Sequence, residues 1–195
     1  MRPPCAGPRG HLIIVSAPSG AGKTSLVKAL LEDADLGLRL SVSTTTRAPR
    51  PGEVEGREYH FTSRETFAMR RDAGEFLEWA HVHGNDYGTS ARTVATAMAA
   101  GHRVILEIDW QGARQLCGLF DKSQRTSIFI LPPSVPELQR RLEARGQDHP
   151  SVIQDRLAAA ETEISHAGEF DHVIMNQDFS ETLAVLRQII AATSR

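Results

Sequence analysis

A chain of 195 residues, 41% of them hydrophobic, is long enough to bury one sizeable core with room for small appended segments. Its 22 basic and 24 acidic residues leave a net charge of −2, which excludes a general electrostatic attraction to nucleic acid or to a membrane surface. No apolar stretch approaches the ~20 residues of a membrane span, so we expect neither a membrane nor a nucleic-acid partner.

The first ten residues are rich in proline and glycine and are expected to form a disordered leader, residues 1–10. One of the two cysteines, Cys5, lies in this leader, and the other is Cys117. A structural disulfide is therefore not expected, and a reducing, cytoplasmic location fits the cysteine usage.

A phosphate-binding loop is the first motif that follows. Leu12–Val15 form an apolar, β-branched run that predicts a buried strand, and the apolar spacing after Thr24 predicts a helix. Between them lies Ser16-Ala17-Pro18-Ser19-Gly20-Ala21-Gly22-Lys23-Thr24, which fits the pattern G-x-x-x-x-G-K-[ST] except at Ala17. The backbone N–H groups of such a loop surround phosphate oxygens, its lysine reaches the β- and γ-phosphates, and its hydroxyl binds Mg²⁺. Alanine is tolerable at the first position only if its φ is negative, and an ordinary strand-to-helix turn is the alternative interpretation.

Two arginines lie on a second candidate loop. Leu38–Ser43 alternate as a strand does and lead into residues 44–53, where proline and glycine exclude a long regular element. Arg47 and Arg50 are three residues apart on this loop, which suits bidentate capture of a second phosphate. Solvated surface arginines are the alternative.

The next segment contains a carboxylate in a predicted strand. Tyr59–Thr62 are expected to form a short strand, and Ser63 to cap a helix that ends near Gly74. In the alternating stretch Glu75–Val82, Glu78 is expected on the same face as Phe76, either exposed or lining a pocket. Residues 85–89 are expected to form a turn, and residues 93–100 a helix.

A β-branched run at residues 103–109 predicts a second core strand that ends in acids. Glu107 and Asp109 are two residues apart and are expected to project from one side of it. A buried carboxylate needs a cation or donor groups, as near the metal of phosphate-loop enzymes. A strand that ends at a polar turn is the alternative.

The last third of the chain predicts a lid. A core strand at Ser127–Leu131 precedes a capping-box pattern at Ser134 and Glu137 and then two helices separated at Gly146. Arginines on these helices would close over a nucleotide, or would form a solvated charged face. A strand at residues 172–176 and a helix capped at Asp178 complete the chain.

Five segments taken together resemble the guanylate kinase family in its bacterial form, whose members phosphorylate GMP with ATP. The segments are Ser16–Thr24, Ser41–Glu53, Gly84–Thr89, Ile108–Gly112 and Ile130–Ser134, and the resemblance runs from about residue 12 to residue 191. The first segment is shared with many NTPases, whereas the second and fourth are highly specific in this order and spacing.

The resemblance implies roles for the matching positions. The family's catalytic groups correspond to Lys23, Arg141, Arg145 and Arg156. ATP binding is implied for Ala17, Pro18, Ser19, Gly20, Ala21, Gly22, Lys23, Thr24, Ser25 and Asn176, with Mg²⁺ on Thr24. GMP binding is implied for Ser43, Arg47, Arg50, Tyr59, Glu78, Tyr87, Thr89, Glu107 and Asp109. Two positions depart from the family: Glu107 replaces a common aspartate, and Asp86 a frequent tyrosine.

The implied fold is the α/β, three-layer P-loop nucleoside monophosphate kinase fold with a mostly parallel core sheet. Its core would comprise residues 11–40, 98–140 and 158–195, with a mixed α+β GMP-binding segment at 41–97 and a helical lid at 141–157. The implied reaction transfers the γ-phosphoryl group of ATP to GMP or dGMP in line, without a covalent intermediate.

Two other functions remain open at this stage. Kinase-like domains of membrane-associated scaffolds keep the fold and bind phosphopeptides, but they tend to lose the phosphate loop or lid arginines that are present here. A sugar-phosphate kinase of related fold is the second, and the guanine-reading set Ser43, Glu78 and Thr89 speaks against it.

Overall fold

The computed structural model describes residues 10–145 and 149–193. Residues 1–9 of the predicted leader, with Cys5, and residues 146–148 of the predicted lid lie outside the described residues. Gly10 is buried and donates its N–H to the carbonyl of Met98 at 2.9 Å, so it belongs to the folded chain and not to a disordered leader.

A five-stranded parallel sheet forms the centre of the molecule. Its strand order is β2 (Leu38–Leu40), β7 (Arg103–Glu107), β1 (Leu12–Ser16), β8 (Arg125–Leu131) and β9 (His172–Met175). β1 is buried along its whole length because both faces of the sheet are covered, which explains why its sequence is continuously apolar.

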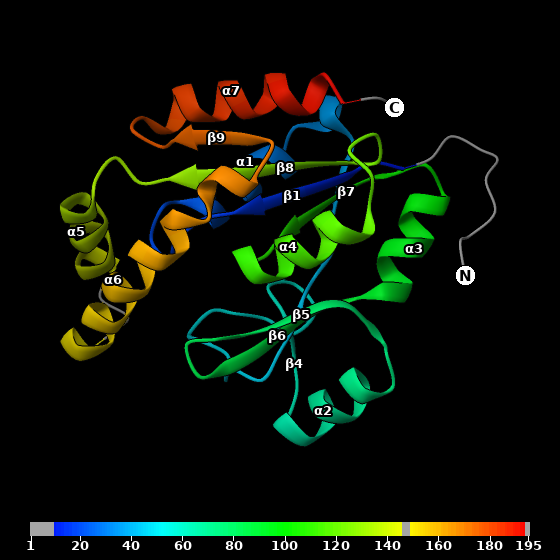
Figure 1. Ribbon diagram of the computed structural model, residues 1–195, viewed down its shortest axis with the longest axis horizontal. Helices are drawn as coiled ribbons and strands as arrows, with labels where there is room; N and C mark the ends of the chain where they lie inside the picture. The colour runs from blue at the N-terminus through cyan, green and yellow to red at the C-terminus, as the bar shows by residue number, and fades with distance from the viewer. Residues whose placement is uncertain (1–9, 146–148, 194–195) are drawn as a thin grey trace.

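Helices cover the two faces and give three layers (Figure 1). Alternate residues of β1 point to opposite sides: Ile13 and Val15 pack with α1 (Lys23–Leu31) and α7 (Phe179–Ala191). Leu12 and Ile14 pack with α3 (Ala91–Ala99) and α4 (Trp110–Leu119). The predicted α/β class with a parallel core sheet is therefore confirmed.

A second, four-stranded sheet lies beside α4 and is ordered β4 (His60–Phe61), β3 (Thr44–Thr45), β6 (Asn85–Ser90) and β5 (Phe76–Val82). Helix α2 (Arg64–Asp72) begins at Ser63, which caps it as expected. The expected turn at residues 85–89 was wrong: these residues form β6, which pairs antiparallel with β5 and β3. Here the cross-strand pairing outweighs the turn-forming composition.

A β-bulge in β5 corrects the expected placement of Glu78. Phe76 pairs with Ser90 and Glu78 with Thr89, so one extra residue separates the two pairs. Phe76 therefore faces α2, where it stacks on Phe67 at 4.5 Å, and Glu78 points to the opposite face, toward α4. The expectation that they share a face was wrong.

The strand predicted at residues 103–109 is also shorter than expected. β7 ends at Glu107, and Asp109 is the N-cap of α4, where its carboxylate accepts the N–H of Gly112 at 3.0 Å. The two acids are therefore not on one side of one strand, because the side chain of Asp109 satisfies a free amide of the next helix.

Two helices project at one end of the central sheet: α5 (Val135–Arg145) and α6 (Pro150–Ser165) (Figure 1). Leu138, Leu142, Ile153 and Ala160 form their own small apolar cluster. Ser134 caps α5, but the Glu137 side chain pairs with Arg140 and Arg141, so only half of the expected capping box forms. Two short 3₁₀ turns, η1 (Ala34–Leu36) and η2 (Ala167–Glu169), follow α1 and α6.

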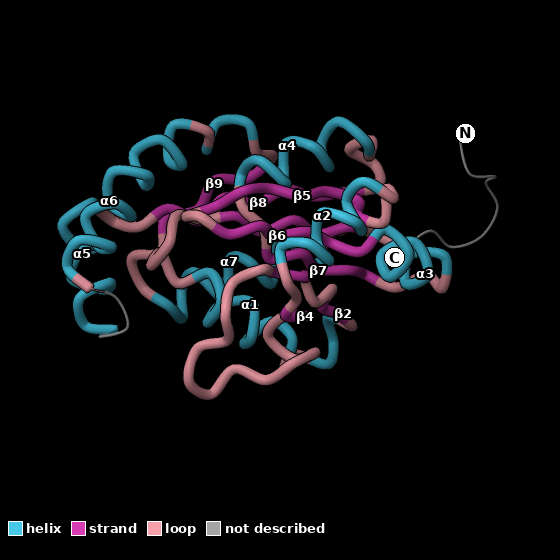
Figure 2. The backbone as a smooth tube through the Cα atoms, turned by 90° about the horizontal axis from the view of Figure 1, so that it is seen from below, coloured by secondary structure: helices cyan, strands magenta, loops and turns pink. Residues whose placement is uncertain are grey.

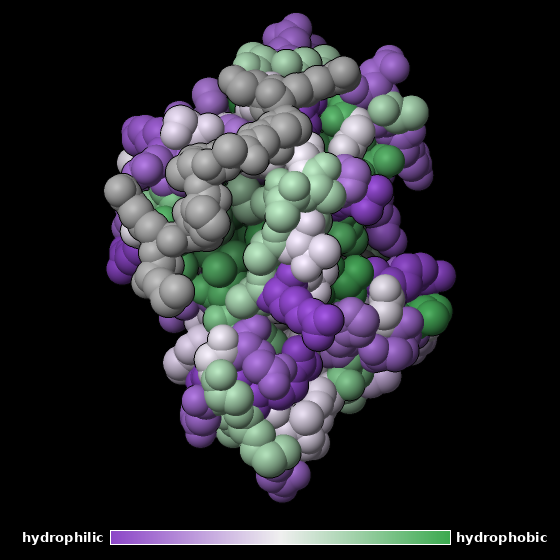
Figure 3. All heavy atoms as spheres, turned by 90° about the vertical axis from the view of Figure 1, so that its right-hand side faces the viewer, coloured by the Kyte–Doolittle hydropathy of each residue, from purple (hydrophilic) through white to green (hydrophobic). Residues whose placement is uncertain are grey.

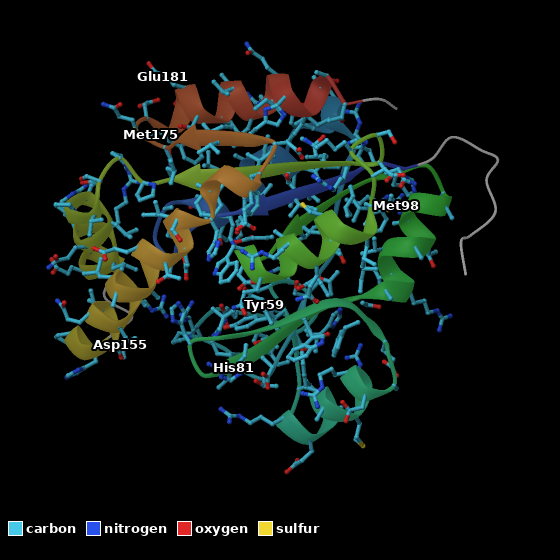
Figure 4. The ribbon with its side chains drawn as sticks, viewed as in Figure 1. Tyr59, His81, Met98, Asp155, Met175 and Glu181 are labelled. Carbon is cyan, nitrogen blue, oxygen red and sulfur yellow. The ribbon has the colours of Figure 1, made fainter. Side chains whose placement is uncertain are left out.

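Figure 2 views the molecule from below Figure 1, and the long loop between β3 and β4 extends away from the sheets toward the lower edge of this picture. The face that carries α3, away from α5 and α6, shows hydrophilic residues interspersed with hydrophobic ones (Figure 3). Within the described ranges, no helix combines the length and apolar character that crossing a bilayer demands. Met98 packs against the core, whereas Met175 on the edge strand β9 is 52% exposed (Figure 4).

Candidate functional site

A cavity of about 800 Å³ lies at the carboxyl end of β1, between the central sheet, the second sheet and the α5–α6 pair. This edge is where open α/β sheets bind ligands. Most of the predicted site residues border it, namely Ala17, Pro18, Ser19, Gly20, Gly22, Lys23, Thr24, Ser25, Ser43, Arg47, Arg50, Tyr59, Glu78, Tyr87, Glu107, Asp109, Arg141 and Arg156.

The glycine-rich loop has the backbone that a phosphate cradle needs. Gly22 adopts φ 96°, which a residue with a Cβ rarely does, and Lys23 opens α1 immediately after it. The Lys23 ammonium donates to the carbonyl of Ile108 at 3.0 Å, which holds it at the cavity wall. Among the described non-glycine residues only His83 has a positive φ, so Ala17 meets the condition for replacing glycine.

Two of the predicted ATP-binding residues do not border the cavity. Ala21 is fully buried, and its carbonyl accepts a 2.7 Å hydrogen bond from the amide of Asn176. Asn176 is 4% exposed and stabilises the loop through this buried hydrogen bond. Its carbonyl also accepts from Arg141 at 3.2 Å, so it connects the loop to α5.

Thr24 in the first turn of α1 and Glu107 at the end of β7 bring two oxygen-bearing side chains together. The Thr24 hydroxyl donates a short hydrogen bond to the Glu107 carboxylate. Among the described residues no cluster of three histidine, cysteine or acidic side chains could hold a metal alone. This donor set fits Mg²⁺, which keeps several waters and is usually bound by one or two protein oxygens together with substrate phosphates.

An arginine–tyrosine cluster occupies the side formed by the second sheet. The Arg47 guanidinium makes a two-pronged ion pair with Glu53 at 2.8 and 2.9 Å, and it lies 5.4 Å from the ring of Tyr59. Burial opposes the charge of Arg47, but the hydrogen bond and charge of Glu53 outweigh it and raise the arginine pKa. Tyr59 packs edge-on against Tyr87 at 5.9 Å. Arg50 shares Glu53 through its backbone N–H at 2.7 Å, so one acid orders the loop that carries both arginines.

The deepest polar group of the cavity is Glu78, which is 3% exposed. Thr89 donates to one of its carboxylate oxygens at 2.5 Å, and Thr89 is fully buried behind it. Burial raises the pKa of Glu78 to about 7; the Thr89 hydrogen bond opposes this shift and the charge of Asp109 adds to it. The other carboxylate oxygen lies against Gly112, where a Cβ would collide with it. A larger residue at this point of α4 would therefore displace the carboxylate of Glu78.

The arginines predicted for the lid are engaged with different partners. Arg141 donates to Glu137 at 2.8 Å, and Arg156 donates to the Ser19 hydroxyl at 2.6 Å. Arg145 is the last residue of α5, and its side chain lies outside the described part of the chain.

The cavity is also bordered by six residues that were not predicted from the sequence as site residues: Val82, His83, Asn85, Ile108, Val152 and Glu163. Glu163 is the most notable because burial raises its pKa to about 7, with Lys23 opposing this shift and Asp109 adding to it. Its spacing of seven residues from Arg156 places both on one face of α6, which is the only signal in the sequence that could have indicated it.

Comparisons with known proteins agree with this geometry. The family model described as guanylate kinase matches residues 9–193. A protein of Bordetella pertussis named guanylate kinase is 57% identical over 187 residues, which cover 96% of this chain and 86% of the relative. One of Dechloromonas aromatica with the same name is 54% identical over 184 residues, covering 94% of this chain and 90% of the relative.

A solved structure supports the same conclusion. The crystal structure of guanylate kinase from Anaplasma phagocytophilum superimposes with a TM-score of 0.80 at 36% identity, and the match covers 97% of this chain and 89% of that one. A family model that spans nearly the whole chain, close relatives and a shared fold lead to one conclusion: this chain belongs to the guanylate kinase family.

Proposed function

We propose that this protein transfers the γ-phosphoryl group of ATP to GMP and releases ADP and GDP. One observation carries the proposal: a single cavity joins a phosphate-binding loop to a buried carboxylate–hydroxyl pair and to an arginine–tyrosine cluster. Such a cavity has a place for two phosphorylated ligands and for one purine base. The name of the relatives, guanylate kinase, states the same activity for them.

Glu78 is the proposed reader of the guanine base. Guanine presents two adjacent donors, N1–H and the exocyclic amine, and an ionised carboxylate accepts both. Adenine has an unprotonated N1 there, which would leave a buried acceptor without a partner at a cost of roughly 1–3 kcal/mol or more. Ser43 and Thr89 are proposed to complete base recognition, and Asp109, which borders the same cavity, is proposed to contribute to GMP binding.

Arg47, Arg50, Tyr59 and Tyr87 are the proposed clamp for the GMP phosphate. Guanidinium groups bind phosphate oxygens in a forked geometry that suits them to this role. Asp86 is not part of the proposed clamp, because its carboxylate accepts a 2.7 Å hydrogen bond from Nδ1 of His81 on the hairpin.

The loop residues 17–25 are proposed to hold the ATP phosphates, with Lys23 at the β- and γ-phosphates. Thr24 would hold Mg²⁺, with Glu107 beside it, and the ion supplies neutralisation of charge on the phosphate oxygens. The role that we propose for Asn176 in ATP binding is indirect, because its amide donates to the carbonyl of Ala21 in the loop.

Positioning and charge neutralisation carry the proposed transfer, and no general base is assigned. Lys23, Arg141, Arg145 and Arg156 are proposed to stabilise the charge that develops on the moving group, from the loop on one side and from the lid on the other. An arginine in such a role is worth ~10³–10⁵ in rate. Transfer is in line, without a covalent intermediate.

Closure is part of the proposal. Residues 141–157 would act as the lid and residues 41–97 as the GMP-binding segment, each moving against the core formed by residues 11–40, 98–140 and 158–195. Closing both would exclude water and limit hydrolysis of ATP. Because the reaction needs free ATP and GMP, the cytoplasm is the proposed location.

A coupled assay of ADP release tests the function. We expect turnover with GMP and with dGMP, and rates at least ~100-fold lower with AMP. A ribose bisphosphate used in preference to GMP would indicate a sugar-phosphate kinase instead, and pure protein that leaves GMP unconverted would refute the proposal.

A further inference from the structure

Glu163 lies where three parts of the cavity wall meet. It belongs to α6, it is half-buried with 14% of its side chain exposed, and it borders the cavity. The roles proposed above for ATP and GMP binding do not use it. Its carboxylate therefore needs another explanation, because burying an acid without a function is costly.

The first contact is with the phosphate-binding loop. The backbone N–H of Ser19 acts on the Glu163 carboxylate and favours its charged form, which opposes the rise that burial causes in the pKa of Glu163. The hydroxyl of the same Ser19 accepts a 2.6 Å hydrogen bond from Arg156. Arg156 lies seven residues before Glu163, on the same face of α6. One face of α6 therefore presents Arg156 to the side chain of Ser19 and Glu163 to its peptide, so α6 and the loop meet at this residue.

The second contact is with the second sheet. His83 occupies the tip of the β5–β6 hairpin, with φ 47°, and its Nε2 lies 3.9 Å from Oε1 of Glu163. The same hairpin carries Glu78 and Tyr87, which are proposed to bind GMP. Other charged groups that act on Glu163 are Lys23 of α1, Asp109 at the start of α4 and Arg156 of its own helix.

We propose that Glu163 is a positioning residue for phosphoryl transfer: it fixes the Ser19 peptide of the loop that holds ATP, and it attracts His83 on the hairpin that holds GMP. The two substrates are thereby aligned through α6. This inference rests on the proposed function. Alignment matters because a displacement of about 1 Å between reacting groups costs ~10²-fold in rate.

Three variants separate the two contacts. Glu163→Gln keeps an oxygen that can accept from Ser19 but removes the negative charge, whereas Glu163→Ala removes both. Glu161→Gln, an exposed acid two residues earlier on α6, is the matched control. Thermal melting of each variant is measured first, so that a folding defect is recognised.

We expect Glu163→Ala to lower kcat ~10-fold or more at saturating ATP and GMP, while the Kd of a non-hydrolysable ATP analogue changes less than ~3-fold. Glu163→Gln should recover kcat to within ~3-fold of the parent but keep a raised KM for GMP. His83→Gln should raise the KM for GMP in the parent and have no further effect in the Glu163→Gln background, because the pair is one interaction.

The inference is overturned if Glu163→Ala keeps kcat within twofold of the parent, if Glu163→Gln is no better than Glu163→Ala, or if the effects of His83→Gln and Glu163→Gln multiply. A purely structural role would lower the melting temperature without rescue by glutamine. Failure of the proposed function itself would be seen separately, because the unmodified protein would then neither bind nor convert GMP.

Discussion

The hydroxyl of Thr89 donates a 2.5 Å hydrogen bond to the carboxylate of Glu78, and the two residues face each other across the antiparallel pair β5–β6. Thr89 is fully buried and Glu78 nearly so, which fixes the carboxylate at the floor of the cavity. One of its oxygens is occupied by Thr89, and the other points toward α4. A fixed buried acceptor of this kind gives a site its strongest means of rejecting a base with the wrong donors.

Replacing Glu78 by glutamine is expected to lower kcat/KM for GMP by ~10²-fold or more, because the amide presents a donor to one of the two guanine donors. The Kd of an ATP analogue should stay within ~2-fold, since Glu78 belongs to β5 of the second sheet and its hydrogen bond is to Thr89. Steady-state kinetics with GMP and AMP check this. Unchanged discrimination between the two bases would show that Glu78 does not read the base.

The use of GMP should depend on pH through Glu78. Because burial raises the pKa of Glu78 to about 7, the acid is mostly protonated at pH 6, and binding guanine requires the ionised form. The affinity for GMP should therefore rise ~10-fold between pH 6 and pH 8 and then level off. Calorimetry in buffers of different ionisation enthalpy should detect proton release on GMP binding at pH 6.5, and no such release would contradict the assignment.

The raised pKa of Glu78 also makes the stability of the free protein depend on pH: stability should fall as the pH rises, whereas the affinity for GMP should increase. The folded chain binds the proton more tightly than the unfolded chain, so the stabilisation is full below the ordinary value of 4.5 and is lost as the pH rises through about 7. Glu78→Gln resembles the neutral acid, and its melting temperature should fall less than that of the parent between pH 5 and pH 8. Glu163 contributes a similar dependence that remains in this variant.

Gly112→Ala should impair GMP binding from a position outside the cavity lining. The added Cβ would collide with Oε2 of Glu78, so the carboxylate must turn away from its bond to Thr89. We expect KM for GMP to rise ~10-fold or more, with the Kd of an ATP analogue unchanged. Gly118→Ala on the same helix, where a Cβ meets nothing within 4 Å, is the control. Equal kinetics for both variants would contradict this geometry.

Lys23→Ala should lower kcat by ~10²-fold or more, as loss of a preorganised donor does elsewhere. Its ammonium is already held toward the cavity by the carbonyl of Ile108 at 3.0 Å. Lys28→Ala removes an exposed lysine from the same helix and should leave kcat near that of the parent. Rates of the two variants that agree within twofold would remove Lys23 from the proposed mechanism.

The sequence by itself determined the elements whose signals are local. A β-branched run beside a glycine-rich loop predicts a buried strand and a phosphate cradle, and prolines and glycine place Arg47 and Arg50 on a loop, because each signal depends on neighbours along the chain. The class of fold and the family followed from several such motifs in order.

Only the tertiary structure decided how distant segments meet. The bulge that turns Glu78 away from Phe76 depends on pairing with β6, and Asp109 leaves the strand because it caps α4. Arg156 reaches Ser19 across 137 residues of sequence, and Asn176 reaches Ala21 across 155. No periodicity encodes such contacts, since a hydrogen bond between remote segments depends on packing of the whole domain, and the local pattern constrains only which face a side chain takes.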